Sequence, residues 1–199
     1  MTANDSTTKL SSRYETARYH SAVGLNWYDA DPTLQFLVHA AFDADGQSWA
    51  EPHLERLGAL MGGPVAEWAV EIDKNPPYLE RYYRWGNESS HVVLPPAFQA
   101  SRAAVEGDNF SSDALRAQAT EAGVDPNLMT AAWGYLLSQA DVGIYCSVGT
   151  GRDMVERLAD AFAPPHVQAR VKELLSATDG TATTAQMFTE RAGGADLRA

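Results

Sequence analysis

Residues 125–145 read DPNLMTAAWGYLLSQADVGIY and form the most apolar stretch of this 199-residue chain. Asp125 before Pro126 predicts a helix start, because the carboxylate can cap free N–H groups and proline suits the first helical turn. Apolar side chains then recur at helical spacing, and the pattern can continue past Asp141 as far as Tyr145. The apolar run is too short and too interrupted to span a bilayer. We therefore expect a central helix buried among other helices.

Further helices are predicted on both sides of this stretch, because amphipathic segments alternate with start and stop signals. Helix boundaries are expected at Asp31-Pro32, Gly62-Gly63-Pro64, Pro95-Pro96, Ser112-Asp113, Gly123, Gly149-Thr150-Gly151 and Pro164-Pro165. Residues 73–92 differ, since they combine the turn sequences Asn75-Pro76-Pro77 and Gly86-Asn87 with several aromatic residues. For this part we expect an extended stretch laid across the helices.

The pattern changes again after Gly180, where threonines and Phe188 favour a strand. The expected fold is therefore mainly α, a helical and up-and-down bundle-like domain that gives way to β structure. We divide the chain into a flexible N-terminal arm at residues 1–23, a helical domain at residues 24–180 and the start of a β-domain at residues 181–199.

Composition limits the partners of this chain. There are 15 Lys and Arg against 26 Asp and Glu, which gives a net charge of −11 and argues against nucleic acid as a partner. Tyr82, Tyr83 and Trp85 beside Arg84 could stack on bases, but no basic stripe accompanies them, so we favour packing. No signal or membrane segment is found at the N-terminus, and a cytoplasmic protein is expected.

No self-sufficient catalytic or metal site is predicted. The five histidines have no spacing that brings two imidazoles onto one helix face, and a zinc site would need such a cluster. Cys146 is the only cysteine, and no neighbouring base is identifiable, so we expect a buried structural thiol in a reducing compartment. We assign no catalytic residue and no metal ligand.

The stretch at residues 187–197, MFTERAGGADL, is different. A threonine followed by two glycines after a strand suits a backbone that approaches a ligand closely and donates its N–H groups to it. A simple Gly-Gly turn between strands is the alternative explanation, and from the residues alone it is the favoured one.

This stretch resembles the Met-Thr-Glu-Pro-x-Ala-Gly-Ser-Asp signature of acyl-CoA dehydrogenases, which lies where their helical N-terminal domain passes into a central β-domain. Residues 189–196 are most similar to the alkylation-response branch, whose version reads Thr-Glu-x-x-Gly-Gly-Ser-Asp. Asn26-Trp27-Tyr28, the Gly62-Gly63 break and Asn75-Pro76-Pro77 resemble the same branch. The resemblance covers the chain from about Gly24 onward.

The resemblance implies a site for FAD, which would be lined by Gln186, Phe188, Thr189, Gly194 and Ala195. In the family, the threonine matching Thr189 and the serine matching position 195 form hydrogen bonds to the flavin or its phosphates. Ala195 has no hydroxyl group, and Arg191 replaces the usual proline of the wider family. One flavin contact is thereby lost, at a cost on the order of 1 kcal/mol.

The implied reaction is α,β-dehydrogenation of an acyl-CoA thioester in fatty acid metabolism, with a glutamate removing the α-proton and hydride passing to FAD. In the family, that base and most cofactor contacts follow the part that this chain matches. The chain is therefore expected to be inactive alone, with acyl-CoA as its substrate once the missing domains, in some cases from a second chain, complete it. The family also allows oligomers. The alternative is a non-catalytic helical interaction module or a truncated remnant.

Overall fold

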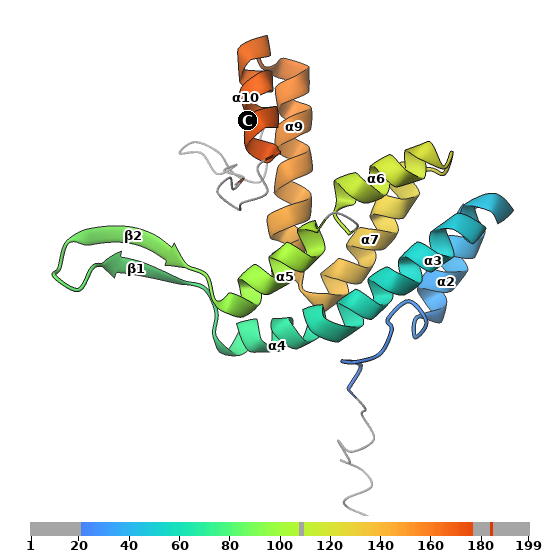
Figure 1. Ribbon diagram of the computed structural model, residues 1–199, viewed down its shortest axis with the longest axis horizontal. Coiled ribbons are helices and arrows are strands. Elements are labelled where there is room, and N and C mark those ends of the chain that lie inside the picture. The colour runs from blue at the N-terminus through green and yellow to red at the C-terminus, as the bar shows by residue number, and fades with distance from the viewer. Residues whose placement is uncertain (1–20, 108–109, 177–183, 185–199) are drawn as a thin grey trace, which may run out of the picture.

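Helices stacked side by side make up most of the molecule (Figure 1). The computed structural model describes residues 21–107, 110–176 and 184, with backbone only at residues 149–153. Its helical elements are α2 (Pro32–Ala41), α3 (Ala44–Leu60), the π-helical turn η2 (Met61–Val65), α4 (Ala66–Lys74), α5 (Pro96–Glu106), α6 (Ser112–Glu121), α7 (Pro126–Ala140), α8 (Val142–Tyr145), the π-helical turn η3 (Cys146–Thr150), α9 (Gly151–Phe162) and α10 (Pro165–Leu175). The mainly α fold is confirmed.

The predicted helix starts are held by the side chains that the sequence places there. Asp31 Oδ1 accepts hydrogen bonds of 2.9 Å from two backbone N–H groups at the start of α2. Asp125 Oδ1 accepts one of 2.8 Å at the start of α7. At the start of α6 the capping residue is Ser111, one position before the predicted Ser112-Asp113, and its Oγ accepts a bond of 3.2 Å. Each bond satisfies a first-turn N–H that has no partner within its own helix.

The glycine pair predicted to separate two helices produces a kink instead of a gap. Helices α3 and α4 are joined by η2, and Gly63 inside it has non-helical torsions of φ −93° and ψ −110°. Pro64, which has no backbone N–H to donate, follows directly after this kink. The two helices therefore form one long bent rod along the base of the molecule (Figure 1).

The apolar stretch is central, as predicted, but it is not one straight helix. Helix α7 ends at Ala140, and Asp141 is extended, with φ −156° and ψ 100°. The Asp141 carboxylate accepts hydrogen bonds from the N–H groups of Gly143 and Ile144, at 2.8 and 3.0 Å, and so starts α8. Helical structure does continue to Tyr145, as α8, but it is interrupted at Asp141, because this local cap competes with the helical ladder.

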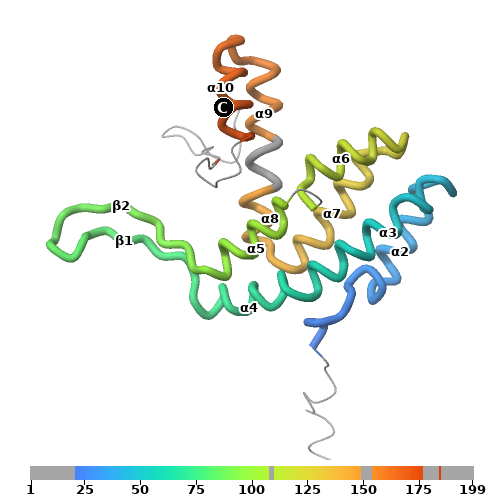
Figure 2. Tube along the Cα trace, viewed as in Figure 1, coloured from blue at the N-terminus to red at the C-terminus, as the bar shows by residue number. Residues whose placement is uncertain are grey.

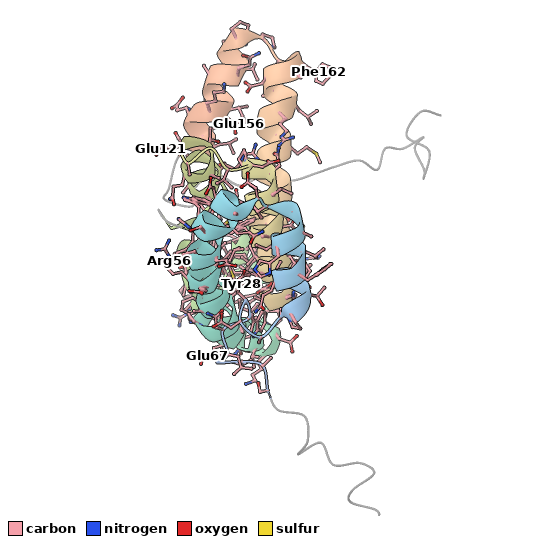
Figure 3. All side chains as sticks on the ribbon, turned by 90° about the vertical axis from the view of Figure 1, so that its right-hand side faces the viewer. Tyr28, Arg56, Glu67, Glu121, Glu156 and Phe162 are labelled. Carbon is pink, nitrogen blue, oxygen red and sulfur yellow. The ribbon has the colours of Figure 1, made fainter. Side chains whose placement is uncertain are left out.

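The core lies between α3 and α7 and is closed by α2, η2, α5 and α6. Its fully buried large side chains are Leu54, Leu57, Met61, Val65, Val105, Leu115, Met129, Leu136, Leu137 and Ile144. The segment before α2 also contributes, because Tyr28, labelled in Figure 3, is only 4% exposed. The helical domain thus has a core to which residues from Tyr28 to Val148 contribute.

Residues 78–93 form an antiparallel hairpin, β1 (Tyr78–Tyr82) and β2 (Glu88–Val93). Tyr78 pairs with Val93 and Leu79 with Val92, and the register is irregular between Glu80 and Tyr82. Extended structure is confirmed here, but its predicted placement is wrong. The hairpin projects away from the ends of α4 and α5 rather than crossing the helices (Figure 1).

The pair α9 and α10 stands apart from the other helices, at the top of Figure 2. Phe162, at the outer end of α9 in Figure 3, is 81% exposed, and α10 has no buried residue. No helix in the described ranges is both long and apolar enough to cross a bilayer. The strand expected after Gly180 and the domain bounds at residues 1–23 and 181–199 depend on residues outside the described ranges.

Candidate functional site

The residues predicted to bind FAD, which are Gln186, Phe188, Thr189, Gly194 and Ala195, lie outside the described residues. Their placement beside a flavin therefore stays a prediction. The described helices offer other surfaces that can be built up from their contacts, namely a polar junction, an apolar groove, a small polar hollow and the exposed hairpin.

The polar junction joins the start of α2 to α7. Tyr135 Oη donates a 3.0 Å hydrogen bond to Asp31 Oδ2, while Asp31 Oδ1 caps α2. The backbone N–H of Leu34 is the main cause that lowers the pKa of Asp31 below its usual 3.8. Burial opposes this effect, and the Tyr135 hydroxyl, the Thr33 N–H and the Gln139 side chain lower the pKa further. The carboxylate is thus held ionised and occupied on both oxygens, which suits a structural role and not that of a general base.

An open hollow of about 430 Å³ lies beside this junction, lined by Ala22, Trp27, Ala30, Asp31, Pro32 and Gln139. Trp27 Nε1 is already used, since it donates a 2.7 Å hydrogen bond to the Ala22 carbonyl. The polar groups of Trp27 and Asp31 are therefore already engaged in hydrogen bonds within the chain.

An apolar groove runs between α2 and α7. Its volume is about 240 Å³, and its lining is almost wholly carbon, from Leu34, Leu37, Val38, Ala41, Phe42, Leu128, Ala131 and Ala132. Leu37 is 48% exposed, and its neighbour Phe36 is 68% exposed. Exposed apolar side chains gathered on one side of a helix indicate a surface that another molecule or segment can cover.

A third hollow, between α5, α6 and α7, is small and polar. It measures about 20 Å³ and is lined by Glu106, Ser111, Ser112, Asp113 and Trp133 together with Val105 and Val148. This is room for about one water molecule and not for a cofactor. Trp133 Nε1 donates a 2.8 Å hydrogen bond to the Phe110 carbonyl beside it, which ties α7 to the loop before α6.

The tip of the hairpin carries the aromatic cluster found in the sequence. Tyr82, Tyr83 and Trp85 are 59%, 56% and 83% exposed, and the Arg84 guanidinium lies 5.4 Å from the centroid of the Trp85 ring. The expectation that these residues pack within the chain is wrong. The hairpin that carries them projects away from the helices (Figure 1).

Cys146 also differs from its prediction, because it is exposed and not buried. Its neighbours Ile144, in α8, and Val148, in the π-helical turn η3 that begins at Cys146, are the residues buried in the core instead. Among histidines, His39 Nε2 lies 2.7 Å from Glu51 Oε1, and His53 stacks on Trp49 at 4.1 Å. No group of three metal-ligating side chains occurs within the described residues.

With the fold in view, comparison with known proteins is informative. Residues 18–179 match the family of the adaptive response protein AidB N-terminal domain. The chain therefore belongs to that family, within the acyl-CoA dehydrogenase-like proteins. No curated protein gives a significant match.

One solved structure, described as "Bd2924 apo-form", is similar over 86% of this chain, with 24% sequence identity and a TM-score of 0.63. The likeness covers 34% of that chain, so this chain spans about a third of its length. At this identity the likeness supports the helical fold, and it says nothing by itself about a reaction.

The groove is the surface that sequence reasoning missed. Its two walls come from helices about 100 positions apart, so only the tertiary structure brings them together. A partial signal was present, because Phe36 and Leu37 add apolar residues outside the buried stripe formed by Leu34 and Val38.

Proposed function

We propose that this chain is the N-terminal portion of a flavin-dependent enzyme that carries out α,β-dehydrogenation of an acyl-CoA thioester. The observation that carries the proposal is family membership over residues 18–179, together with the threonine and glycine pair that follow the matched region. The matched region is helical, and in this proposal it forms one wall of the enzyme, while residues 186–195 form one edge of the FAD site.

Flavin chemistry supplies the redox step, and the protein's part is to hold the cofactor and the substrate in place. In the proposal the Thr189 hydroxyl and the backbone N–H of Gly194 donate hydrogen bonds to FAD. Ala195 offers its backbone alone, so the site depends on Thr189 for a side-chain hydroxyl. The proposed base and further contacts come from other domains, because the matched region makes up only 34% of the solved relative.

Titration with FAD tests this proposal. The chain is mixed with FAD alone and then together with the remaining domains of the enzyme, and flavin fluorescence is followed. We expect binding in the completed enzyme, with Thr189→Val weakening it by about five- to tenfold through the loss of one hydrogen bond. Thr184→Val, outside the motif, is the matched control and is expected to leave the affinity unchanged. Equal effects of the two substitutions would count against the assigned role of Thr189.

A non-catalytic helical interaction module is the second candidate, and the exposed aromatic tip of the hairpin favours it. It is expected to give a colourless helical protein that takes up no FAD even when the other domains are present. Uptake of FAD with acyl-CoA-dependent bleaching in the completed enzyme would rule this candidate out.

A further inference from the structure

The segment before α2 runs along one face of the bent rod formed by α3, η2 and α4 (Figure 1). Residues 22–27 are called the strap here, and Tyr28, which is only 4% exposed, anchors the end of the strap in the core. Three carbonyl groups of the rod accept hydrogen bonds from the strap: those of Gly62 (2.7 Å, from the Gly24 N–H), Gly58 (3.1 Å, from the Trp27 N–H) and Glu55 (3.0 Å, from the Asn26 side-chain amide). The accepting residues are three and four positions apart, so they share one face of the rod.

Two glycines admit the strap to this face. A Cβ atom added at Gly58 would collide with Asn26 Oδ1, and one added at Gly62 would collide with the Leu25 carbonyl oxygen. A side chain at either position would therefore hold the strap away from the rod, and its hydrogen bonds would be lost.

The strap uses a carbonyl group that the kink of the rod leaves without its helical partner. In an unbroken α-helix the Gly62 carbonyl accepts a hydrogen bond from the N–H four residues later, that of Ala66. In η2 the Ala66 N–H bonds to the carbonyls of Gly63 and Met61 instead. The Gly62 carbonyl is then available to Gly24. Because the strap bonds a group that the kinked rod provides, a bound strap stabilises the kink.

Proline makes the rod bendable at the same place. Pro64 has no N–H to donate to the preceding turn, so the hydrogen-bond ladder is interrupted there. The bend at such a point is fixed by whatever packs against it. On the core side these contacts come from Met61 and Val65, which are fully buried, and on another face they come from the strap.

The bend of the rod sets the direction of the hairpin. Helix α4 packs against α5, and the hairpin projects from the ends of these two helices (Figure 1). The nine residues of α4 span about 13 Å, and the strands of five and six residues add about 17–20 Å. At the end of this lever of about 30 Å, a change of about 20° in the bend moves the tip of the hairpin by about 10 Å.

We propose that the strap is a latch that controls the direction of the hairpin. While the strap lies on Gly58 and Gly62, the bend of the rod is fixed and the exposed Trp85 points in one direction. When the strap lifts off, with Tyr28 still anchored, the rod bends over a wider range and the tip is presented in several directions. This inference goes beyond the proposed enzyme function and does not depend on it.

Gly24→Val loosens the strap with little change elsewhere. Gly24 has φ of +92°, which is an outlier for a β-branched residue, and nothing lies within 4 Å of an added Cβ. Gly123→Val, in the turn between α6 and α7, is the matched control, because Gly123 has φ of +75° and equally open surroundings. Asn26→Ala is a second latch variant, and it removes the hydrogen bond to Glu55. Circular dichroism checks that each variant keeps the helical fold.

Electron paramagnetic resonance measures the direction of the hairpin as a distance between two nitroxide labels. The labels are attached at Ser48→Cys on α3 and Glu88→Cys on β2, both exposed positions, in a chain that also carries Cys146→Ser. We expect one narrow distance peak without a latch substitution and with Gly123→Val. With Gly24→Val or Asn26→Ala the peak is expected to broaden or shift by about 5–10 Å. Amide hydrogen exchange of residues 22–27 is expected to become faster in the same two variants.

The two measurements together decide the proposal. Faster exchange of the strap with an unchanged distance peak would overturn it, because the strap would then lift without moving the hairpin. Unchanged exchange in both latch variants would also overturn it, since a strap that neither substitution loosens is not a latch. A distance change of the same size in Gly123→Val would assign the effect to general loosening of the helices, and the proposal would be wrong.

Discussion

Tyr135 Oη and Asp31 Oδ2 lie 3.0 Å apart although their residues are 104 positions apart in the sequence. The contact joins the capped start of α2 to the middle of α7, the two helices that line the apolar groove. Asp31 raises the pKa of Tyr135 through the same hydrogen bond that helps to lower the pKa of Asp31. One interaction thus stabilises the ionised carboxylate and the neutral phenol together.

Removing the Tyr135 hydroxyl is expected to have a small, measurable effect. Tyr135→Phe should lower the free energy of unfolding by about 1 kcal/mol or less, because the hydrogen bond is partly open to solvent. Tyr82→Phe, on the exposed hairpin, is the control and should have no effect. Urea denaturation followed by circular dichroism measures both, and a loss well above that of a single hydrogen bond would show that Tyr135 has another role.

Stability is expected to fall in acid partly through Asp31. The pKa of Asp31 is lower in the folded state than in the unfolded state. Its contribution to the free energy of unfolding is therefore fully present above the unfolded-state pKa near 3.8, and it is lost as the pH falls through the lower folded-state pKa. In Asp31→Asn this contribution is absent, so the variant should lose less stability than the wild type between about pH 5 and pH 2. Unfolding curves at several pH values give the comparison; parallel losses in the two proteins would contradict it.

Gly62→Ala is expected to be strongly destabilising. The Gly62 carbonyl accepts a 2.7 Å hydrogen bond from Gly24, and an added Cβ would collide with the Leu25 carbonyl and lie 2.7 Å from Trp27 Nε1. Because backbone and a large ring must move, we expect a loss of about 2–3 kcal/mol. Ala59→Ser adds an atom of similar size to an exposed position of the same rod and should cost less than about 0.5 kcal/mol.

The cap at Asp141 can be separated from its charge. Asp141→Ala removes the acceptor for two N–H groups at the start of α8 and should cost about 1 kcal/mol, whereas Asp141→Asn keeps an acceptor and should cost a few tenths. Thermal unfolding ranks the two variants. If both were equally destabilised, the negative charge and not the hydrogen bonds would be what Asp141 contributes.

Core packing predicts a contrast between two leucines. Leu137 on α7 is fully buried, so Leu137→Ala should lower the free energy of unfolding by about 2–5 kcal/mol through a cavity. Leu158 on α9 is 50% exposed, and Leu158→Ala should cost well under half as much. Chemical denaturation measures both, and similar losses would mean that α9 is covered in solution by something outside the described chain.

Helix boundaries were predictable because their signals are local. The side chains of Asp31, Ser111 and Asp125 bond N–H groups within three residues of themselves, so their effect is readable from neighbours in the sequence. The break at Asp141 is equally local, but the apolar period continues through it, so the sequence left open whether one helix runs on to Tyr145. In the structure the Asp141 cap ends α7 and starts α8.

By itself, the sequence determined the mainly helical fold, most helix ends, the central place of residues 125–145 and, through residues 18–179, the family. These properties depend on period, capping and motif, which act between residues close together in the chain. Only the tertiary structure decided that Trp85 stands in solvent, that Cys146 is exposed and that α2 and α7 enclose a groove. The reason is that the exposure of a side chain depends on which distant segments cover it. Apolar periodicity predicts which face of a helix is buried, but it does not indicate which segment packs against that face.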